Sequence, residues 1–363
     1  RAGAVASAGA AATLTLRTAL ALTIPLAAAL AALTLTACGG SSSGSDDSNA
    51  ASGSDSGSAG SYKVGIVQLV QHEALDAATQ GFQDKLKELV EADGGSVEFD
   101  PQNASGESAN CTTIVNGFVS EGVDLIMANA TAALQAAQAG TNTIPVLGTS
   151  VTEYGVALGI DDFDGLVGTN ISGTSDLAPL DEQAGIIKEL FPDAKTVGLL
   201  YCSAEPNSQY QVDTVKASLE ELGYTCEYYA FSDSNDLATV CQSAADASDV
   251  IYVPTDNTVA NNTEIVNNIC QPAGVPVVAG EEGIMGGCGV ATLSISYYDL
   301  GVATGKMAAK ILTGESKVEE MPIEYLRSSL RNTTRPLPKL WASPSQMIMW
   351  HTRAKQPERP ALI

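Results

Sequence analysis

The residues with the most usable chemistry follow apolar runs that are typical of buried strands. Thr131, Thr149 and Ser150 follow or end two such runs, and Asp256 follows a third. Hydroxyl groups and the free amides at a helix start can bind a carboxylate, and a buried carboxylate such as that of Asp256 needs a cationic partner such as an ammonium group. Together they favour a site for a small ligand that carries both charges, although each residue could instead cap a helix or close a turn.

Other residues at comparable positions complete the candidate site. Gln68 and His72 follow the first strand-like run, where they could line a pocket for the ligand's side chain. The segments CSAEPNS (202–208) and VPTDN (253–257) could hydrogen-bond the ligand from a second side, or only cap the helices that follow them. The full set of candidate ligand-binding residues is Gln68, His72, Ala130, Thr131, Thr149, Ser150, Glu205, Asn207, Ser208, Asp256 and Asn257, with Tyr201, Phe231 or Tyr297 as candidate aromatic walls and Glu281 and Glu282 ranked below them.

The composition excludes several kinds of protein. A formal net charge of −24 disfavours nucleic acid as a partner, because its phosphates would be repelled. Since no arginine occurs between Arg17 and Arg327, hydroxyls and amides rather than a guanidinium must hold an anionic ligand. Only His72 and His351 are present, which excludes a histidine-rich metal site, and no nucleophile elbow or phosphate-binding loop indicates an enzyme. We therefore expect a binding protein without a metal or cofactor.

Alternating strand-like and helical patterns must position these residues. From Tyr62 onward, short β-branched runs such as YKVGIVQLV (62–70) and TVGLLYC (196–202) alternate with helical patterns. This order predicts parallel sheets covered by helices on both faces. The polar stretch VGTNISGTSD (167–176) separates two such series, so the predicted fold class is α/β with two doubly wound parallel-sheet lobes. Ligands bind beyond the carboxyl ends of such strands, which here would meet at a shared cleft.

The amino-terminal segment has the pattern of an export signal followed by a tether. Residues 18–36 carry no charge, and LTAC (35–38) closes this apolar run. The small residues before a single cysteine resemble the lipobox of bacterial lipoproteins, which implies cleavage before Cys38 and attachment of a lipid to its thiol. We therefore predict a signal peptide over residues 1–37 and a lipidated, flexible Gly/Ser/Asp tether over residues 38–61. A retained transmembrane helix is the alternative, which the interrupting proline and the many alanines disfavour.

A family resemblance rests on seven segments that follow one another in order across residues 62–326: VGIVQLVQHEALDAATQGF, PQNASGESANCTTIVNGFV, DLIMANATAALQAA, IPVLGTSVT, VGLLYCSAEPNSQYQVDTVK, DVIYVPTDNTVA and YYDLGVATGKMAAKILTGE. Together they resemble the lipoprotein substrate-binding components of ABC importers assigned to tryptophan, tyrosine or phenylalanine, which have the type I periplasmic binding fold. The resemblance implies an amino acid held between two hinged lobes and delivered to a membrane permease that a separate ATPase drives. We expect a monomer, anchored by its lipid at the extracytoplasmic face of the cell membrane.

The resemblance also implies how the chain divides between the lobes. The first lobe is expected to comprise residues 62–174 and 291–317, and the second residues 175–290 and 318–326. Hinge strands are expected to join them, and helix 298–313 is expected to return to the first lobe.

The chain departs from the family after about Leu326. Residues 327–363 hold seven of the 18 basic residues, five of the 15 prolines and both tryptophans. This abrupt change favours translation in a shifted reading frame, and a genuine basic tail that meets anionic lipid is the alternative. Re-sequencing that finds a clean frame through residue 363 would remove the frameshift interpretation.

Six cysteines besides Cys38 leave the question of disulfides open. They could form up to three disulfides with 15 possible pairings, or remain buried thiols. These cysteines are Cys111, Cys202, Cys226, Cys241, Cys270 and Cys288.

Other functions and ligands also stay open from the sequence. A ligand-sensing receptor partner uses the same fold and tether, and only its partners would distinguish it. A branched-chain amino acid, a nucleoside or a sugar is an alternative ligand, although sugar-binding proteins typically show more stacking aromatics. A transcriptional repressor shares the fold, but it would need a basic helix-turn-helix in place of the signal peptide.

Overall fold

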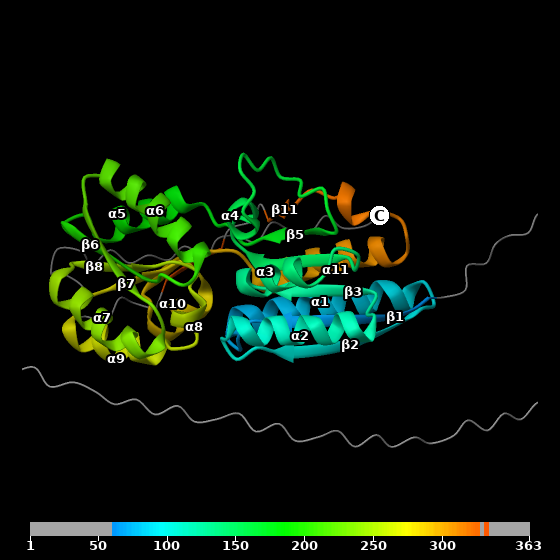
Figure 1. The fold of residues 1–363 in the computed structure, drawn as a ribbon. Coiled ribbons are helices and arrows are strands. Elements are labelled where there is room, and N and C mark those ends of the chain that lie inside the picture. The colour runs from blue at the N-terminus through cyan, green and yellow to red at the C-terminus, as the bar shows by residue number, and fades with distance from the viewer. Residues whose placement is uncertain (1–59, 327–329, 334–363) are drawn as a thin grey trace, which may run out of the picture. The chain divides into compact units, whose positions relative to one another are not determined.

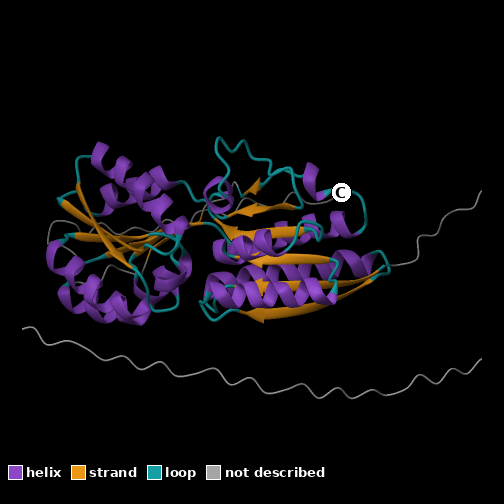
Figure 2. Ribbon diagram, viewed as in Figure 1, coloured by secondary structure: helices purple, strands orange, loops and turns teal. Residues whose placement is uncertain are grey.

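The computed structural model describes residues 60–326 and 330–333. The predicted signal peptide, Cys38 and nearly all of the predicted tether lie outside the described residues. The described chain forms two α/β lobes, each built on its own six-stranded sheet (Figures 1 and 2). The predicted fold class of two lobes with mostly parallel sheets is therefore confirmed.

The first lobe contains an all-parallel sheet with the strand order β11-β5-β4-β3-β1-β2. Apolar side chains of α1 and α11 cover one face of this sheet, and those of α2 and α3 cover the other. The elements are β1 (Ser61–Gln68), α1 (Glu73–Ala92), β2 (Ser96–Asn103), α2 (Ser108–Glu121), β3 (Leu125–Asn129), α3 (Thr131–Gly140), β4 (Val146–Val151), α4 (Tyr154–Leu158), β5 (Ile171–Ser175), α11 (Tyr297–Leu312), the 3₁₀ helix η1 (Val318–Glu320) and β11 (Glu324–Tyr325).

The second lobe contains a sheet with the strand order β12-β10-β9-β8-β6-β7, in which only β12 runs antiparallel. Helices α5 and α6 pack on one face, and α7, α9 and α10 pack on the other. Its elements are α5 (Leu180–Leu190), β6 (Thr196–Cys202), α6 (Pro206–Glu221), β7 (Thr225–Phe231), α7 (Ser234–Ala247), β8 (Val250–Val253), α8 (Asn257–Ala260), α9 (Thr263–Ala273), β9 (Val277–Ala279), α10 (Glu282–Cys288), β10 (Ala291–Ser294) and β12 (Leu330–Thr333).

The predicted lobe boundaries are wrong at two places. Strand β10, which the sequence assigned to the first lobe with residues 291–317, pairs with β9 in the second sheet. Residues 318–326, assigned to the second lobe, belong to the first, because β11 pairs with β5 and the Ser172 hydroxyl donates to the Met321 carbonyl oxygen at 2.8 Å. The chain thus passes between the lobes after β5, between β10 and α11, and between β11 and β12. Helix α11 packs on α1 in the first lobe, where it was expected.

Glycines allow α1 and α11 to pack with their backbones in contact. A Cβ atom placed on Gly301 would lie 2.0 Å from the carbonyl oxygen of Ala78, and one placed on Gly81 would lie 2.1 Å from that of Tyr298. No side chain fits at such separations, so the crossing requires glycine at both positions. This contact fixes the start of α11, where Tyr297 lies.

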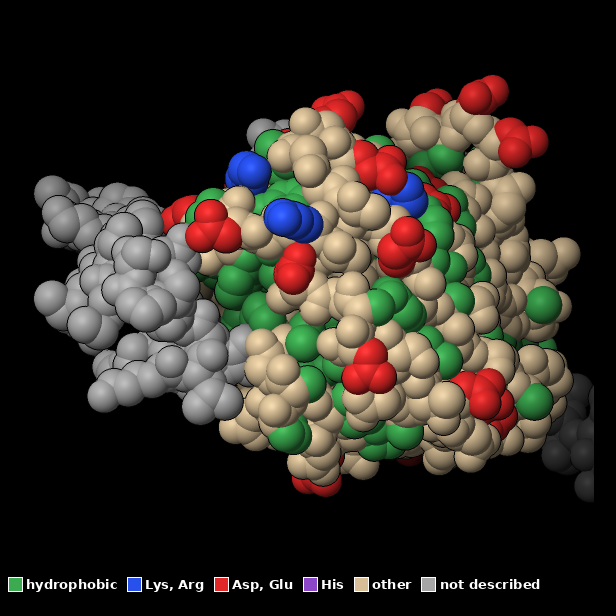
Figure 3. Space-filling view, turned by 90° about the vertical axis from the view of Figure 1, so that its left-hand side faces the viewer, with side chains coloured by type: hydrophobic (Ala, Val, Ile, Leu, Met, Phe, Trp, Pro, Cys, Tyr) green, Lys and Arg blue, Asp and Glu red, His purple; other side chains and the backbone are tan. Residues whose placement is uncertain are grey.

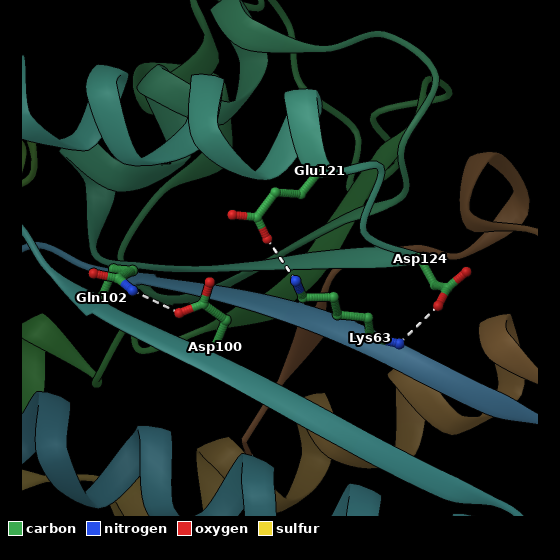
Figure 4. Close-up of polar contacts among 5 residues, drawn as sticks. All are labelled: Lys63, Asp100, Gln102, Glu121 and Asp124. Atoms are coloured by element: carbon green, nitrogen blue, oxygen red, sulfur yellow. Dashed lines mark hydrogen bonds and ion pairs between the residues drawn. The ribbon is translucent and has the colours of Figure 1, made fainter.

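Aspartates at the amino ends of β3 and β8 tie neighbouring strands together in the same way in both lobes. In the first lobe, the backbone amide of Lys63 donates to Asp124 at 2.7 Å, and the Lys63 ammonium donates to Glu121, while Gln102 donates to Asp100 nearby (Figure 4). In the second lobe, the amides of Lys195 and Thr196 donate to Asp249 at 2.7 and 2.9 Å, and these bonds lower the pKa of Asp249. The contacts of Asp124 and Asp249 lie at the strand ends opposite to those that carry the candidate site.

The described surface agrees with the acidic composition. On the face of the second lobe that Figure 3 shows, acidic side chains are scattered among uncharged ones and basic side chains are few. None of the helices within residues 60–326 and 330–333 is both long and apolar enough to span a bilayer.

The structure describes six of the seven cysteines and only residues 330–333 of the carboxyl-terminal segment 327–363. All six cysteines of the described residues are free thiols in this structure. Residues 330–333 form β12 against β10, whereas residues 334–363 lie outside the described part of the chain. The frameshift interpretation of the tail therefore stays a prediction.

Candidate functional site

A small cavity lies where the carboxyl ends of strands from both sheets meet. Half of its lining comes from each lobe. The first lobe contributes His72, Leu75, Ser150, Thr152, Asp176 and Tyr297, and the second contributes Asn207, Thr255, Asp256, Asn257, Ala260 and Glu281. This is the position at which doubly wound folds bind their ligands.

Asp176 has a buried carboxylate with one free oxygen. It directly follows β5, and its backbone amide donates to the carbonyl oxygen of Val151. Its Oδ2 accepts a hydrogen bond from the Tyr297 hydroxyl at 2.9 Å, whereas Oδ1 has no partner among the described residues. Only 4% of Asp176 is exposed. Burial raises the pKa of this carboxyl group, and the neighbouring hydroxyls of Tyr297 and Thr152 partly offset the rise.

The other two carboxyl groups of the lining are already occupied by backbone amides. Asp256 accepts from the amide of Cys202 at 2.7 Å and from that of Val259 at 2.9 Å, which caps α8. Glu281 accepts from the amides of Gly283 and Ile284 and so caps α10. Burial raises the pKa of Asp256 to about 8, with a further contribution from Glu205, and burial raises that of Glu281 to about 7. Both groups therefore serve first as helix caps.

The cavity lacks a cation to balance these acids. Among the described residues that line it, none is a lysine or an arginine. The one basic side chain of the lining is His72, and burial lowers its pKa, which favours the neutral ring. An unpaired carboxylate in such a place is costly unless a ligand brings a positive charge.

The amino end of α3 is suited to a negatively charged group. Its first amides carry no side-chain cap, and Ala130 and Thr131 are buried. Ser150 lies beside them, because Asn129 of β3 pairs with Thr149 of β4, and the buried Ser150 hydroxyl has no hydrogen-bond partner among the described residues. Uncapped amides and a free hydroxyl together can receive an anionic group.

Backbone strain is concentrated at the same strand ends. Ala130 has φ 89° and ψ 159°, a conformation that only glycine adopts readily, and Ser150 has φ 53° in the left-handed region. Each costs about 1–3 kcal/mol and persists only because the surrounding structure enforces it. Such strain is typical of backbone that is arranged for binding.

Hydrogen bonds join the two lobes around the cavity. The His72 ring contacts the side-chain oxygen of Asn257 at 3.1 Å. Gln211 of α6 donates to Thr255 and to Thr152, which lies in the first lobe. These contacts connect the half of the lining in the first lobe to the half in the second.

The structure brings together five of the candidate residues predicted from the sequence. His72, Ser150, Asn207, Asp256 and Asn257 line the cavity, although their roles toward a ligand stay predictions. The Asp256 carboxylate, predicted as the ammonium partner, instead has both oxygens engaged by amides.

The other six candidates do not line the cavity. The Gln68 amide bonds to Val70, Asp76 and Thr79, so it fixes the start of α1 instead of forming a side-chain pocket. Glu205 caps α8 with four hydrogen bonds from Asn257 and Thr258. The other four are next to lining residues or bonded within the core: Ala130 and Thr131 begin α3 beside Ser150, Thr149 is bonded to the hydroxyls of Thr174 and Thr304, and Ser208 is bonded to the Asp256 carboxylate.

Five lining residues escaped the sequence analysis, namely Leu75, Thr152, Asp176, Thr255 and Ala260. Asp176 was the most consequential omission, because residues 167–176 were interpreted as a polar separator. The position of Asp176 in the sequence could have identified it. Asp176 directly follows the strand ISGTS, and other candidate residues likewise follow a strand. The strand was not recognised because four of its five residues are serine, threonine or glycine, although all five are buried.

No group of three or more potential metal ligands occurs among the residues that the structure describes.

Comparisons with known proteins agree with this geometry. A family model described as "ABC transporter substrate binding protein" matches residues 63–330. A "Tyrosine-binding protein" of Clostridioides difficile (strain R20291) is 34% identical over 283 residues, which cover 78% of this chain and 81% of that protein.

Two solved structures are similar over most of their length. One, from Streptococcus pneumonia, is described as an ABC domain in complex with L-Trp. It has 33% identity and a TM-score of 0.69, and the match covers 74% of this chain and 91% of that one. The other is a ligand-free, open substrate binding protein with adhesive properties from Clostridium difficile. It has 36% identity and a TM-score of 0.59, and the match covers 79% of this chain and 97% of that one.

Proposed function

Since the chain belongs to the family of ABC transporter substrate-binding proteins, we propose that it captures a free aromatic amino acid in the cavity described above. The family's role is to bind a solute outside the cytoplasm and to present it to a permease, so the protein is not an enzyme.

The free oxygen of Asp176 is the observation that carries the proposal. It is a buried hydrogen-bond acceptor on an acidic group, and the cavity around it contains no lysine or arginine among the described residues. An α-ammonium group supplies both the hydrogen and the positive charge that this oxygen lacks. We assign this role to Asp176 instead of Asp256, because amides already occupy both oxygens of Asp256.

The carboxylate of the same ligand has a partner on the neighbouring strands. The uncapped start of α3 and the free Ser150 hydroxyl form an anion-binding surface without any arginine. Asp176 follows β5, which pairs with β4, the strand that ends at Ser150 and Val151. Both charged ends of an amino acid can therefore be held at the edge of one sheet, which leaves its side chain to point toward the second lobe.

The remaining lining suits an aromatic side chain. Leu75 and Ala260 provide apolar contact, and Tyr297 also lines the cavity. Relatives described as binding tyrosine and L-Trp support this ligand class.

We also propose how the protein is held at the cell surface. Cleavage before Cys38 and lipidation of its thiol would tether the monomeric two-lobed body, through residues 38–61, to the outer face of the membrane beside its permease. Mass spectrometry of the membrane fraction should find the lipid on an amino-terminal Cys38.

A ligand panel tests the proposed function. The purified protein is heated with each proteinogenic amino acid in turn, and with a sugar and a nucleoside as controls. We expect aromatic amino acids to raise the melting temperature by roughly 5–10 °C at about 100 times their Kd, because ligand binding stabilises the folded state. A rise with leucine, isoleucine or valine alone, or with the sugar or nucleoside alone, would show that the protein binds that class of ligand instead of aromatic amino acids. No rise with any amino acid would remove the proposal.

A further inference from the structure

The hydrogen-bond network around His72 fixes which nitrogen of its ring carries the proton. Asn257 donates from its Nδ2 to the Glu205 carboxylate at 2.8 Å, and a carboxylate only accepts hydrogen bonds. The side-chain oxygen of Asn257 must therefore face His72, whose Nε2 lies 3.1 Å away. Nε2 is then the donor and carries the proton.

The second nitrogen of this ring is left as a buried acceptor. Burial lowers the pKa of His72, which keeps the ring neutral and Nδ1 without a proton. Nδ1 has no hydrogen-bond partner among the described residues, and His72 lines the cavity. A ligand that offers a hydrogen-bond donor at this nitrogen gains a bond, and one without a donor leaves the nitrogen buried and unpaired.

We propose that His72 is a specificity-determining residue, whose Nδ1 accepts a hydrogen bond from the side chain of the bound amino acid. The ligand class is an aromatic amino acid with a polar hydrogen, namely the phenol O–H of tyrosine or the indole N–H of tryptophan. Phenylalanine fills the same apolar surface of Leu75 and Ala260 but lacks the donor. This inference rests on the proposed function.

Calorimetric titration of the full protein with tyrosine, tryptophan and phenylalanine tests the role of His72. The better of tyrosine and tryptophan should bind about 10- to 100-fold more tightly than phenylalanine. Para-fluorophenylalanine, which is close to tyrosine in size but has no donor, should bind as weakly as phenylalanine. In the variant His72→Phe, the preference should fall to within about 3-fold, because the acceptor is gone. The variant His72→Phe also removes the hydrogen bond to Asn257. That loss should weaken the binding of all three amino acids equally, so it should not change the ratio of their affinities.

The variant Gln80→Ala is the control, because Gln80 lies on the exposed side of α1 and outside the cavity lining, and this variant should keep both the affinities and the preference. If phenylalanine or para-fluorophenylalanine binds the wild-type protein as tightly as tyrosine and tryptophan, His72 has no such role. The same conclusion follows if the preference survives His72→Phe. Should no amino acid bind the wild-type protein, the proposed function itself fails.

Two cysteines outside the cavity lining lie close together. Cys241 of α7 and Cys270 of α9 lie with their sulfur atoms 3.7 Å apart, and both are buried in the same apolar cluster. A disulfide needs about 2.05 Å between the sulfurs, which small side-chain rotations of adjacent helices can supply. Hydrogen bonding from Cys270 lowers the pKa of Cys241, which favours Cys241 as the attacking thiolate.

We propose that Cys241 and Cys270 form a structural disulfide when the protein folds outside the cytoplasm, where disulfides persist. The oxidant is the disulfide of a thiol oxidoreductase, for which oxidised glutathione substitutes in the test. The Cys241 thiolate attacks one sulfur of the oxidant and releases the other as a thiolate. The Cys270 thiolate then attacks the Cys241 sulfur and releases the second thiol, so the two protons of the cysteines end on the reduced oxidant.

Peptide mapping tests this pairing. Protein refolded with oxidised and reduced glutathione is alkylated, digested without reductant and analysed by mass spectrometry. We expect the peptides of Cys241 and Cys270 to be linked, and reduction to lower the melting temperature by roughly 5–10 °C. The variant Cys111→Ser should keep this link and Cys270→Ser should abolish it. Alkylated Cys241 and Cys270 in the oxidised wild-type sample, or a link from either to Cys288 instead, would overturn the assignment.

Discussion

The substitution Asp176→Asn is expected to weaken amino-acid binding by about 2–5 kcal/mol, a loss of roughly 30- to 5,000-fold in affinity. Asparagine keeps an oxygen that can accept from the Tyr297 hydroxyl, but it carries no charge for the ligand's ammonium group. The ligand's positive charge would then be buried without a counterion. Calorimetric titration of both proteins with the best ligand of the panel measures the loss.

The stability of the same variant separates a binding role from a structural one. Because Asp176→Asn removes an unpaired buried charge, the melting temperature of the ligand-free variant should stay level or rise. Asp256→Ala is the matched comparison, since it removes two acceptors of backbone amides and should lower the free energy of unfolding by about 1–3 kcal/mol. Wild-type affinity in Asp176→Asn, together with lost affinity in a stable Asp256→Ala protein, would restore the assignment made from the sequence.

The substitution Gly301→Ala is expected to lower the free energy of unfolding by about 3 kcal/mol or more. Its new methyl group would lie 2.0 Å from the carbonyl oxygen of Ala78, so the two helix backbones would have to separate. The glycines on both helices and the apolar cluster of Leu86 and Met307 beneath them leave no room for a smaller adjustment. Urea unfolding measures this loss as a shift of the transition midpoint.

Gly185 provides the control for Gly301. It lies in α5, and a Cβ atom placed there would meet nothing within 4 Å. Gly185→Ala should therefore raise the free energy of unfolding by about 0.5–1 kcal/mol through its better helix propensity. A loss below about 1 kcal/mol in Gly301→Ala would show that the close contact of α1 with α11 is not needed.

Much of the fold could be predicted because buried parallel strands are apolar along their whole length. Runs such as VGIVQ in β1 and LIMAN in β3 stand out from the amphipathic helices between them, and their alternation predicts doubly wound sheets. Strands at the lobe boundaries lacked this signal. Strand β11 has two residues and β5 is built from serine, threonine, glycine and isoleucine, so neither their lobe nor their ends could be read from hydrophobicity.

The candidate site could be located from the sequence, but the roles of its residues could not be assigned. A polar residue after an apolar strand is expected near the cleft, and Asp256 and Ser150 do lie there. Whether such a side chain faces a ligand or caps a helix depends on which backbone amides are free nearby. The sequence does not show which amides are free. For Asp256, the amides of Cys202 and Val259 occupy both carboxylate oxygens, so the side chain caps a helix.

A crystal structure of the protein with the amino acid that raises its melting temperature most would test the central claim directly. The account predicts the ligand's ammonium nitrogen at about 2.7–3.2 Å from Asp176 Oδ1, with its carboxylate against the start of α3 and the Ser150 hydroxyl. A ligand whose ammonium group lies on Asp256 or Glu281, or one bound outside this cavity, would contradict it.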